Sequence, residues 1–287
     1  MTLGVLASGR LGYAVLRQLA PDYTLNFVMT DVKSVDIQRF CDEEGIDCFV
    51  GNPRKGKCVN FIKDKVIDVL VSVNYLFIID LDLIELPQKV AFNIHGSMLP
   101  RYRGRTPHVW AIINNEKVTG ITAHIIDENC DTGAILEQVQ VSIDDEDTGA
   151  SILDRFETLY PTLINQVLSK IEHNEITRTP QQEHLATYFG KRTPEDGQIN
   201  WNWQRERIRN WVRAQAAPYP GAFSWHDGEK IILDEVALDD YGFNWQMPNG
   251  LILTKNPLRV KTPNGALRLT RTRLMNSDAL SEGVILK

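Results

Sequence analysis

Long apolar runs, a basic excess and a secretory leader are all missing from this sequence of 287 residues. No apolar run approaches the roughly 20 residues that a membrane-spanning helix needs. The N-terminus shows no basic segment followed by an apolar stretch and a cleavage site, so we expect no secretion signal. Basic residues number 31 against 37 acidic residues, which gives a formal net charge of -6. We therefore expect neither a membrane protein nor a non-specific nucleic-acid binder, because the latter normally carries a basic excess.

Cysteine is scarce, and its spacing argues against the common cysteine-based sites. The four cysteines form no C-x-x-C pair and no spaced metal set; they are Cys41, Cys48, Cys58 and Cys130. We expect free thiols in a reducing cytosol, hence a cytoplasmic protein, and no bound metal. The G-x-S-x-G motif is also missing, which argues against a serine nucleophile elbow. In an enzyme, the nucleophile is then expected to come from the substrate.

What is present is an alternation of strand and helix patterns. Apolar runs at residues 2–7, 25–30 and 90–95 read as short strands, and DVLVSVNYLFII is the expected central strand. Residues 35–44 read as a helix that Gly45 would end. Such alternation predicts a doubly wound, mostly parallel α/β sheet. Its ligands are expected outside the carboxyl ends of the strands.

Further along, residues 120–126 and 134–143 predict two more strands that flank the loop 127–133. Residues 148–173 carry apolar side chains at spacings of three and four, which predicts one long helix with a single buried stripe. Pro161 lies inside this helix and is expected to kink it or divide it in two.

The composition changes after about residue 187. Five of the six tryptophans follow that point, and short strand patterns (KIILDEVAL, LRVKT, GALRLTRTRL) alternate with Pro, Gly and Asn turns. We predict two domains, residues 1–187 and residues 188–287, of which the second is smaller, β-rich and preceded by a helix near 206–215. The second domain carries 14 basic and 11 acidic residues, so it is only mildly positive.

The turn after the first strand carries part of a dinucleotide-binding fingerprint. The three glycine positions of that fingerprint hold Ala7, Gly9 and Gly12, and Asp31 has the spacing of a ribose-binding acid. Three interpretations stay open: a plain tight turn, an anion site at a helix N-terminus to which Arg10 would add charge, and a nicotinamide site. The missing first glycine weakens the third.

The most informative segment follows the strand at 90–95. The alternation of a strand puts Asn93 and His95 on one face, and the loop at 127–133 supplies Asp131. An amide can stabilise a developing oxyanion, while an imidazole and a carboxylate can move and orient a proton. Taken singly, each residue is more often structural. In this order and in these loops, the three predict a catalytic site at one edge of the sheet.

The residues AFNIHGSMLPRYRGRTPHVWAIINNE, followed by GITAHIIDENCDTGAIL, resemble the catalytic core of the 10-formyltetrahydrofolate-dependent formyltransferases. The resemblance is strong over about residues 60–145 and extends over 1–220. It implies a Rossmann-like core with Asn93, His95 and Asp131 as the catalytic residues. It also implies 10-formyltetrahydrofolate as cosubstrate, for which we expect contacts from Ser97, Leu99, Asp127 and Tyr75.

The family formylates several amines, and the sequence favours one branch. Ser8-Gly9-Arg10 departs from the phosphate loop of the glycinamide ribonucleotide branch, whereas KRTPEDGQINW resembles a linker shared by the tRNA and sugar branches. The acidic balance disfavours tRNA, whose binding must neutralise several phosphates. We favour a dTDP-linked amino-deoxy sugar as acceptor, with methionyl-tRNA as the alternative. Candidate diphosphate contacts are Arg10, Arg105, Tyr188 and Arg192.

The resemblance also sets expectations for the protein's surroundings. The product would serve cell-surface polysaccharide building, such as lipopolysaccharide O-antigen biosynthesis, and the partner would be a second copy in a homodimer. Two other rivals remain: an NAD(P)-linked oxidoreductase, which nicotinamide binding would reveal, and a non-catalytic folate-binding regulator, which the intact trio of residues disfavours.

Overall fold

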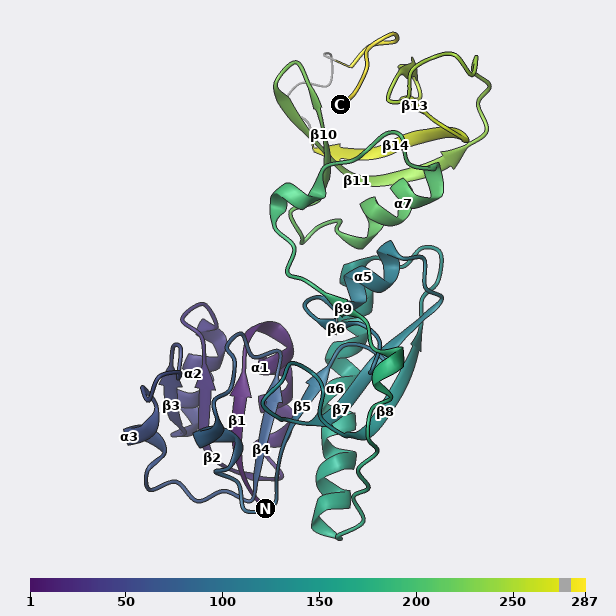
Figure 1. Cartoon of the computed structure of the whole chain (residues 1–287). Helices are drawn as coiled ribbons and strands as arrows, with labels where there is room; N and C mark the ends of the chain where they lie inside the picture. The colour runs from purple at the N-terminus through teal and green to yellow at the C-terminus, as the bar shows by residue number, and fades with distance from the viewer. Residues whose placement is uncertain (274–279) are drawn as a thin grey trace. The chain divides into compact units, whose positions relative to one another are not determined.

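The structure, a computed structural model, describes residues 1–273 and 280–287. Elements of the described chain form two compact units, and each unit is assembled from three stretches of sequence (Figure 1). Unit 1 comprises Met1–Gly104, Thr119–Val141 and Asp154–Phe189. Unit 2 comprises Arg105–Val118, Ser142–Leu153 and Gly190–Lys287. The predicted domain boundary between residues 187 and 188 stays a prediction.

Unit 1 is built on a seven-stranded sheet with the order β3-β2-β1-β4-β5-β7-β8. The first five strands in this order pair in parallel, and β7 joins antiparallel to β5. Their bounds are Thr2–Ala7 (β1), Thr24–Thr30 (β2), Asp47–Val50 (β3), Val69–Val73 (β4), Val90–His95 (β5), Val118–Ile125 (β7) and Ile135–Ser142 (β8). This confirms the predicted Rossmann-like, mostly parallel sheet.

The helices connecting these strands are α1 (Gly9–Leu19), α2 (Val35–Glu44), α3 (Val59–Ile62) and α4 (Leu81–Ile84). Helix α2 has the predicted bounds and ends where Gly45 adopts a left-handed backbone with φ of 67°. Helix α6 (Gly149–Glu172) continues past Pro161 without a break, so of the two predicted effects, a kink or a division, the division is wrong. Its buried stripe, which includes Phe156 and Leu163, holds the helix together through tertiary packing.

Strand β4 is shorter than the apolar run that predicted it. It ends at Val73, and Asn74 then takes a left-handed φ of 51°, which turns the chain out of the sheet. Beyond that turn Leu76 and Ile78 are 42% and 64% exposed. The run DVLVSVNYLFII is therefore part central strand and part apolar loop.

Unit 2 contains a five-stranded antiparallel sheet with the order β10-β11-β14-β13-β12. Its strands are Ala222–His226 (β10), Glu229–Asp239 (β11), Ile252–Thr254 (β12), Arg259–Thr262 (β13) and Gly265–Arg273 (β14). Helices α5 (Pro107–Ile113) and α7 (Arg205–Ala214) belong to this unit. The β-rich C-terminal region is thus confirmed, while Leu274, the last residue of one predicted strand, lies outside the described residues.

Within the described part of the chain, no helix combines the length and the apolar character that a bilayer crossing demands. The four cysteines are free thiols.

Candidate active site

Two antiparallel strands bring the predicted catalytic residues together. Asn93 and His95 lie at the carboxyl end of β5, two residues apart and on one face, as the strand alternation predicted. The register pairs Asn93 with His124 of β7 and His95 with Thr122. Asp131 lies in the loop that follows β7. The sheet therefore delivers an amide, two imidazoles and a carboxylate to one edge.

The carboxylate of Asp131 lies between two imidazoles. Its Oδ2 is 3.5 Å from His95 Nδ1, and its Oδ1 is 3.6 Å from His124 Nε2. The side-chain amide nitrogen of Asn93 is 3.1 Å from the same His124 Nε2. The three predicted catalytic residues thus gather around a fourth, His124, that our sequence reasoning missed. No local pattern pointed to His124, because it joins the group only through the antiparallel pairing of β5 with β7.

Hydrogen bonds to carbonyl groups define which imidazole nitrogens carry protons. Nε2 of His95 lies 2.7 Å from the carbonyl oxygen of Tyr102, which can only accept, so Nε2 donates and Nδ1 faces Asp131. In the same way Nδ1 of His124 donates to the carbonyl of Ile125 at 2.8 Å. Its Nε2 is then free to accept from the amide of Asn93.

The environment moves the proton affinities of this cluster. Burial lowers the pKa of His95 below its ordinary value, and the nearby Asp131 only partly offsets that effect. Burial alone would raise the pKa of Asp131, but the imidazoles of His95 and His124 and the N–H of Gly104 outweigh it and lower the pKa. The carboxylate accepts that N–H at 2.9 Å. Near neutral pH the site therefore holds an ionised carboxylate beside a neutral imidazole.

Two of the predicted folate contacts brace the loop after β5. The hydroxyl of Ser97 donates to the carbonyl of Arg101 at 2.7 Å, and the backbone N–H of Leu99 donates to the hydroxyl of Thr122 at 3.2 Å. Both residues are buried, at 1% and 3% exposure. The structure thus gives both residues a part in shaping the loop, and their role toward folate stays a prediction.

Tyr75, another predicted folate contact, lies in the apolar loop after β4. Its ring packs edge-on against Phe77, with centroids 5.4 Å apart. Its hydroxyl is buried and has no hydrogen-bond partner among the described residues, and burial raises its pKa. A buried hydroxyl without a partner is costly, which makes it a candidate to bind a polar ligand atom.

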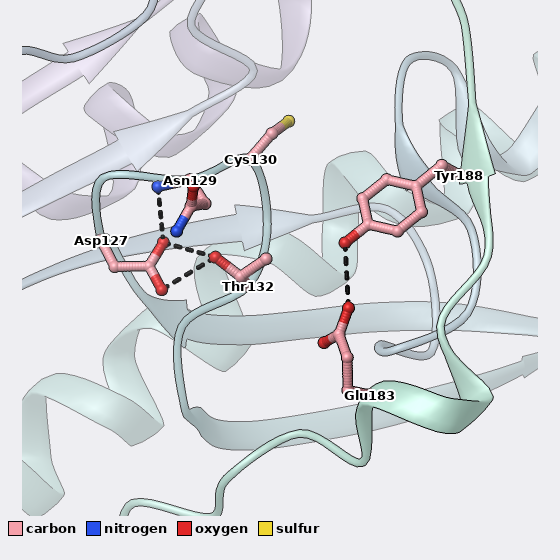
Figure 2. Close-up of a pocket in the computed structure, with 6 residues that line it drawn as sticks. All are labelled: Asp127, Asn129, Cys130, Thr132, Glu183 and Tyr188. Atoms are coloured by element: carbon pink, nitrogen blue, oxygen red, sulfur yellow. Dashed lines mark hydrogen bonds between the residues drawn. The ribbon is translucent and has the colours of Figure 1, made fainter.

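A polar cavity of about 510 Å³ opens beside the Asp131 loop (Figure 2). It is lined by Asp127, Asn129, Cys130, Thr132, Glu183 and Tyr188. Asp127 accepts from the hydroxyl of Thr132 at 2.7 and 2.8 Å, and the hydroxyl of Tyr188 donates to Glu183 at 3.3 Å. The cavity therefore brings together one predicted folate residue, Asp127, and one predicted substrate residue, Tyr188.

The three predicted substrate arginines do not line this cavity. Arg10 of α1 forms ion pairs with Asp154 and, at 2.9 Å, with Glu157, both on α6. Arg105 and Arg192 belong to unit 2, where Arg105 is exposed. Their proposed contacts with a diphosphate stay predictions.

Arg192 is held inside unit 2 by its own neighbours. Its guanidinium lies 5.0 Å from the ring centre of Trp110 and 4.3 Å from that of Trp211. It also donates to the side-chain oxygen of Gln215 at 2.9 Å. These contacts give Arg192 a packing role that the sequence did not predict. Across the residues that the structure describes, no group of three or more His, Cys, Asp or Glu side chains is arranged to hold a metal ion.

Comparison with family models identifies the class of protein to which the chain belongs. A family model described as "Formyl transferase" matches residues 51–168, and a second, "Formyl transferase, C-terminal domain", matches residues 191–286. Together the two matches span most of the chain, which therefore belongs to the formyl transferase family. The first match contains the whole cluster of Asn93, His95, His124 and Asp131.

Among individual proteins, the chain is similar to the bifunctional polymyxin resistance protein ArnA of Wigglesworthia glossinidia brevipalpis, at 32% identity over 79% of this chain. This chain spans about a third of that relative, 34% of its length. The fold matches an N-formyltransferase from Helicobacter canadensis in complex with folinic acid and dTDP-3-aminofucose, with a TM-score of 0.71, 18% identity and coverage of 94% and 99% of the two chains. It also matches WlaRD, a sugar 3N-formyl transferase in the presence of dTDP and 5-N-formyl-THF, with a TM-score of 0.70, 19% identity and coverage of 94% and 98%.

Proposed function

We propose that this protein transfers the formyl group of 10-formyltetrahydrofolate to the amine of a dTDP-linked amino-deoxy sugar. The observation that carries the proposal is the gathering of Asn93, His95 and Asp131 at one sheet edge in a chain of the formyl transferase family. Two matched structures of the same fold were determined with dTDP or a dTDP-sugar and a formyl folate. Both comparisons support a sugar amine as the acceptor.

In this proposal each of the three residues has a part in the transfer. The neutral sugar amine attacks the formyl carbon, so a new C–N bond forms while the carbonyl oxygen gains negative charge. Asn93 stabilises that oxyanion through its side-chain N–H. The amine proton leaves by way of Asp131, and the imidazole of His95, whose unprotonated Nδ1 faces that carboxylate, supports the charge as the proton moves. Cleavage of the bond to the folate nitrogen, which takes up a proton, completes the exchange.

The loop after β4 has the chemistry that a flat, partly polar ring system requires. Tyr75 presents a buried hydroxyl without a partner among the described residues, and Leu76 and Ile78 expose apolar side chains on the same loop. The pterin of the cosubstrate would pack against such apolar groups and supply polar atoms to the hydroxyl. Ser97, Leu99 and Asp127 complete the proposed set of folate residues.

The polar cavity fits a sugar better than it fits a phosphate chain. Its lining offers two carboxylates, hydroxyls and an amide, and it includes no lysine or arginine. Such groups bind hydroxyls and amines, whereas phosphates need cationic partners. We assign the amino-sugar ring to this cavity, with Tyr188 as one of its contacts. Arg10, Arg105 and Arg192 remain the proposed diphosphate contacts.

Part of the positive charge of unit 2 is paired with acidic residues of the same unit, which leaves less of it for the rival acceptor, methionyl-tRNA. Four of its arginines form ion pairs with acidic residues of the same unit: Arg205 with Asp240, Arg209 with Glu146, Arg259 with Asp239 and Arg273 with Asp234. A tRNA-binding surface must neutralise several phosphates at once. The pairing therefore favours the small anionic substrate. A cytoplasmic location, a homodimer and a role in lipopolysaccharide O-antigen biosynthesis belong to the same proposal.

Mass spectrometry of dTDP-linked 3-amino and 4-amino 6-deoxyhexoses, incubated with the protein and 10-formyltetrahydrofolate, tests the proposal. We expect one sugar to gain the mass of one formyl group, and the gain to disappear with Asn93→Ala. Formylation of charged initiator tRNA, with every sugar unchanged, would overturn the sugar assignment. Undiminished turnover by both Asn93→Ala and His95→Ala would overturn the catalytic assignment.

A further inference from the structure

A fully buried arginine lies beside the proposed catalytic loop. Arg103 has 0% exposure, and all five of its N–H donors have partners. Nε and Nη2 donate to Oε1 of Gln181 at 3.2 and 2.9 Å, and Nη1 and Nη2 donate to the carboxylate of Glu183, both at 2.9 Å. The remaining donor of Nη1 reaches the hydroxyl of Tyr188. A buried cation with every donor satisfied forms a rigid anchor.

Gln181 connects this anchor to the loop that carries Asp131. Its amide nitrogen donates to the backbone carbonyl of Asp131 at 2.9 Å and to that of Gly133 at 2.8 Å. Its side-chain oxygen accepts from Arg103, so the orientation of the amide is defined by donors on one side and carbonyls on the other. Both N–H groups and the oxygen of this amide are therefore occupied by groups of the protein.

Asp131 is a residue whose backbone needs such support. Its φ of 58° lies in the left-handed region, which residues other than glycine adopt at a cost. Its side chain is held separately, because Oδ2 accepts the N–H of Gly104, the residue directly after Arg103. The backbone and the carboxylate of Asp131 are thus both attached to the segment that contains Arg103.

We propose that Gln181 is a positioning residue for formyl transfer, which holds the Asp131 backbone so that the carboxylate stays between His95 and His124. This inference rests on the proposed function, because it assigns Gln181 a part in that reaction. Gln181 contacts neither the amine nor the formyl group in this scheme. It acts only through the loop, by way of the two carbonyl groups of Asp131 and Gly133.

Replacing Gln181 by glutamate separates its hydrogen bonds to the Asp131 loop from its hydrogen bonds to Arg103. A carboxylate still accepts from Arg103 but cannot donate to the two loop carbonyls, so Asp131 loses its support while the arginine keeps a partner. Displacement of a reacting group by about 1 Å can cost about 100-fold in rate. We expect kcat of Gln181→Glu to fall by about 10- to 100-fold, with KM for folate and sugar changed less than about twofold.

The neighbouring Gln182→Glu is the matched control. It makes the same change of charge one residue away, where the side chain is exposed, and we expect its kcat to stay within about twofold of wild type. Gln181→Met, a neutral variant of similar length, serves if the glutamate variant does not fold. A kcat that stays at the wild-type level in the folded Gln181 variants would overturn the proposal.

NMR titration of the imidazole signals, without any substrate, measures the pKa of His95. A loss of stability alone would not change this quantity. The groups facing His95 are Asp131, His124 and the carbonyl of Tyr102. Since Asp131 favours the charged imidazole, its displacement in Gln181→Met should lower the pKa of His95. An unchanged titration in the folded variant would overturn the proposal. If wild type formylates no amino sugar at all, the proposed function fails, and this titration still decides whether Gln181 positions Asp131.

Discussion

Two turns of unit 1 carry sequence motifs at the carboxyl ends of parallel strands, and only one of them presents reactive groups. The turn after β1 contains Gly9, and Asp31 lies beside it, directly after the neighbouring strand β2. The turn after β5 lies beside Asp131. Both aspartates have a lowered pKa. The comparison shows that a motif predicts a site only when its polar groups are left available by the fold.

In the turn after β1, the N–H of Gly9 and the carboxylate of Asp31, which a phosphate and a ribose would need, already have partners within the protein. The N–H of Gly9 donates to the hydroxyl of Ser34 at 2.9 Å, so it is not available to a phosphate. Asp31, at 4% exposure, accepts from the hydroxyl of Ser34 at 2.6 Å and from the N–H of Lys33 at 2.8 Å. Burial alone would raise the pKa of Asp31, but these neutral donors lower it. Of the three interpretations of this turn, the geometry favours a plain tight turn.

The turn after β5 differs in the kind of partner that surrounds its aspartate. Asp131 faces two imidazoles that can themselves accept or release a proton, in addition to one backbone N–H. A proton added to or removed from this cluster can therefore be redistributed among its members. Around Asp31 the donors are a hydroxyl and an amide, which do not titrate near neutral pH. The surroundings of Asp131 suit catalysis, and those of Asp31 suit a structural role.

The largest expected difference between the two turns appears when each aspartate is exchanged for asparagine. Asp131→Asn removes the carboxylate proposed to take the amine proton, and we expect turnover to fall by about 1,000-fold. Asp31→Asn should leave turnover within about threefold and reduce the free energy of unfolding by about 2 kcal/mol, because it weakens hydrogen bonds to a charged group. Initial rates of sugar formylation and denaturant unfolding measure the two effects. Comparable losses of turnover in both variants would show that the turns are not different in kind.

The positions of these turns could be predicted from the sequence. Whether their polar groups already have partners within the protein could not. Buried apolar runs predicted β1 and β5 at their observed bounds, and the alternation within β5 placed Asn93 and His95 on one face. Ser34 satisfies the first turn through a contact 25 residues away. Such contacts depend on how strands and loops pack, which local periodicity does not encode.

The same limit explains what was missed in the proposed site. His124 lies opposite Asn93 only because β7 pairs antiparallel with β5 in one particular register. Gln181 lies 50 residues from Asp131 and 78 from Arg103. Local patterns therefore led to the proposed catalytic residues, and the supporting residues required the three-dimensional fold.

The pH dependence of stability should sharpen the comparison, because His95 and Asp31 affect stability in different pH ranges. Burial lowers the pKa of His95, so the folded protein binds its proton less tightly than the unfolded chain. The contribution of His95 to the free energy of unfolding is therefore retained above about pH 6.5 and lost as the pH falls below that value. The lowered pKa of Asp31 has the same sign, but the loss begins only below about pH 3.9.

Denaturant unfolding between pH 7.5 and 3 checks this assignment. His95→Gln should flatten the decline in stability just below pH 6.5 relative to wild type, and Asp31→Asn should leave that part of the curve unchanged. The latter variant should instead reduce the decline below about pH 3.9. A wild-type slope near pH 6 that His95→Gln does not alter would contradict the buried, neutral imidazole.

The smallest expected effect concerns Gly9, where φ is 62° and an added Cβ would meet only Asn74 Nδ2 at 3.5 Å. Since space is available, Gly9→Ala should cost only the left-handed backbone strain, about 1 kcal/mol, with turnover and the KM for the nucleotide sugar unchanged. The matched control is Gly190→Ala, where φ lies outside the left-handed region and nothing is within 4 Å of the added Cβ; it should be close to neutral in thermal unfolding. A KM raised severalfold by Gly9→Ala alone would instead indicate that this turn binds the diphosphate, because an anion site needs the close backbone approach that a methyl group obstructs.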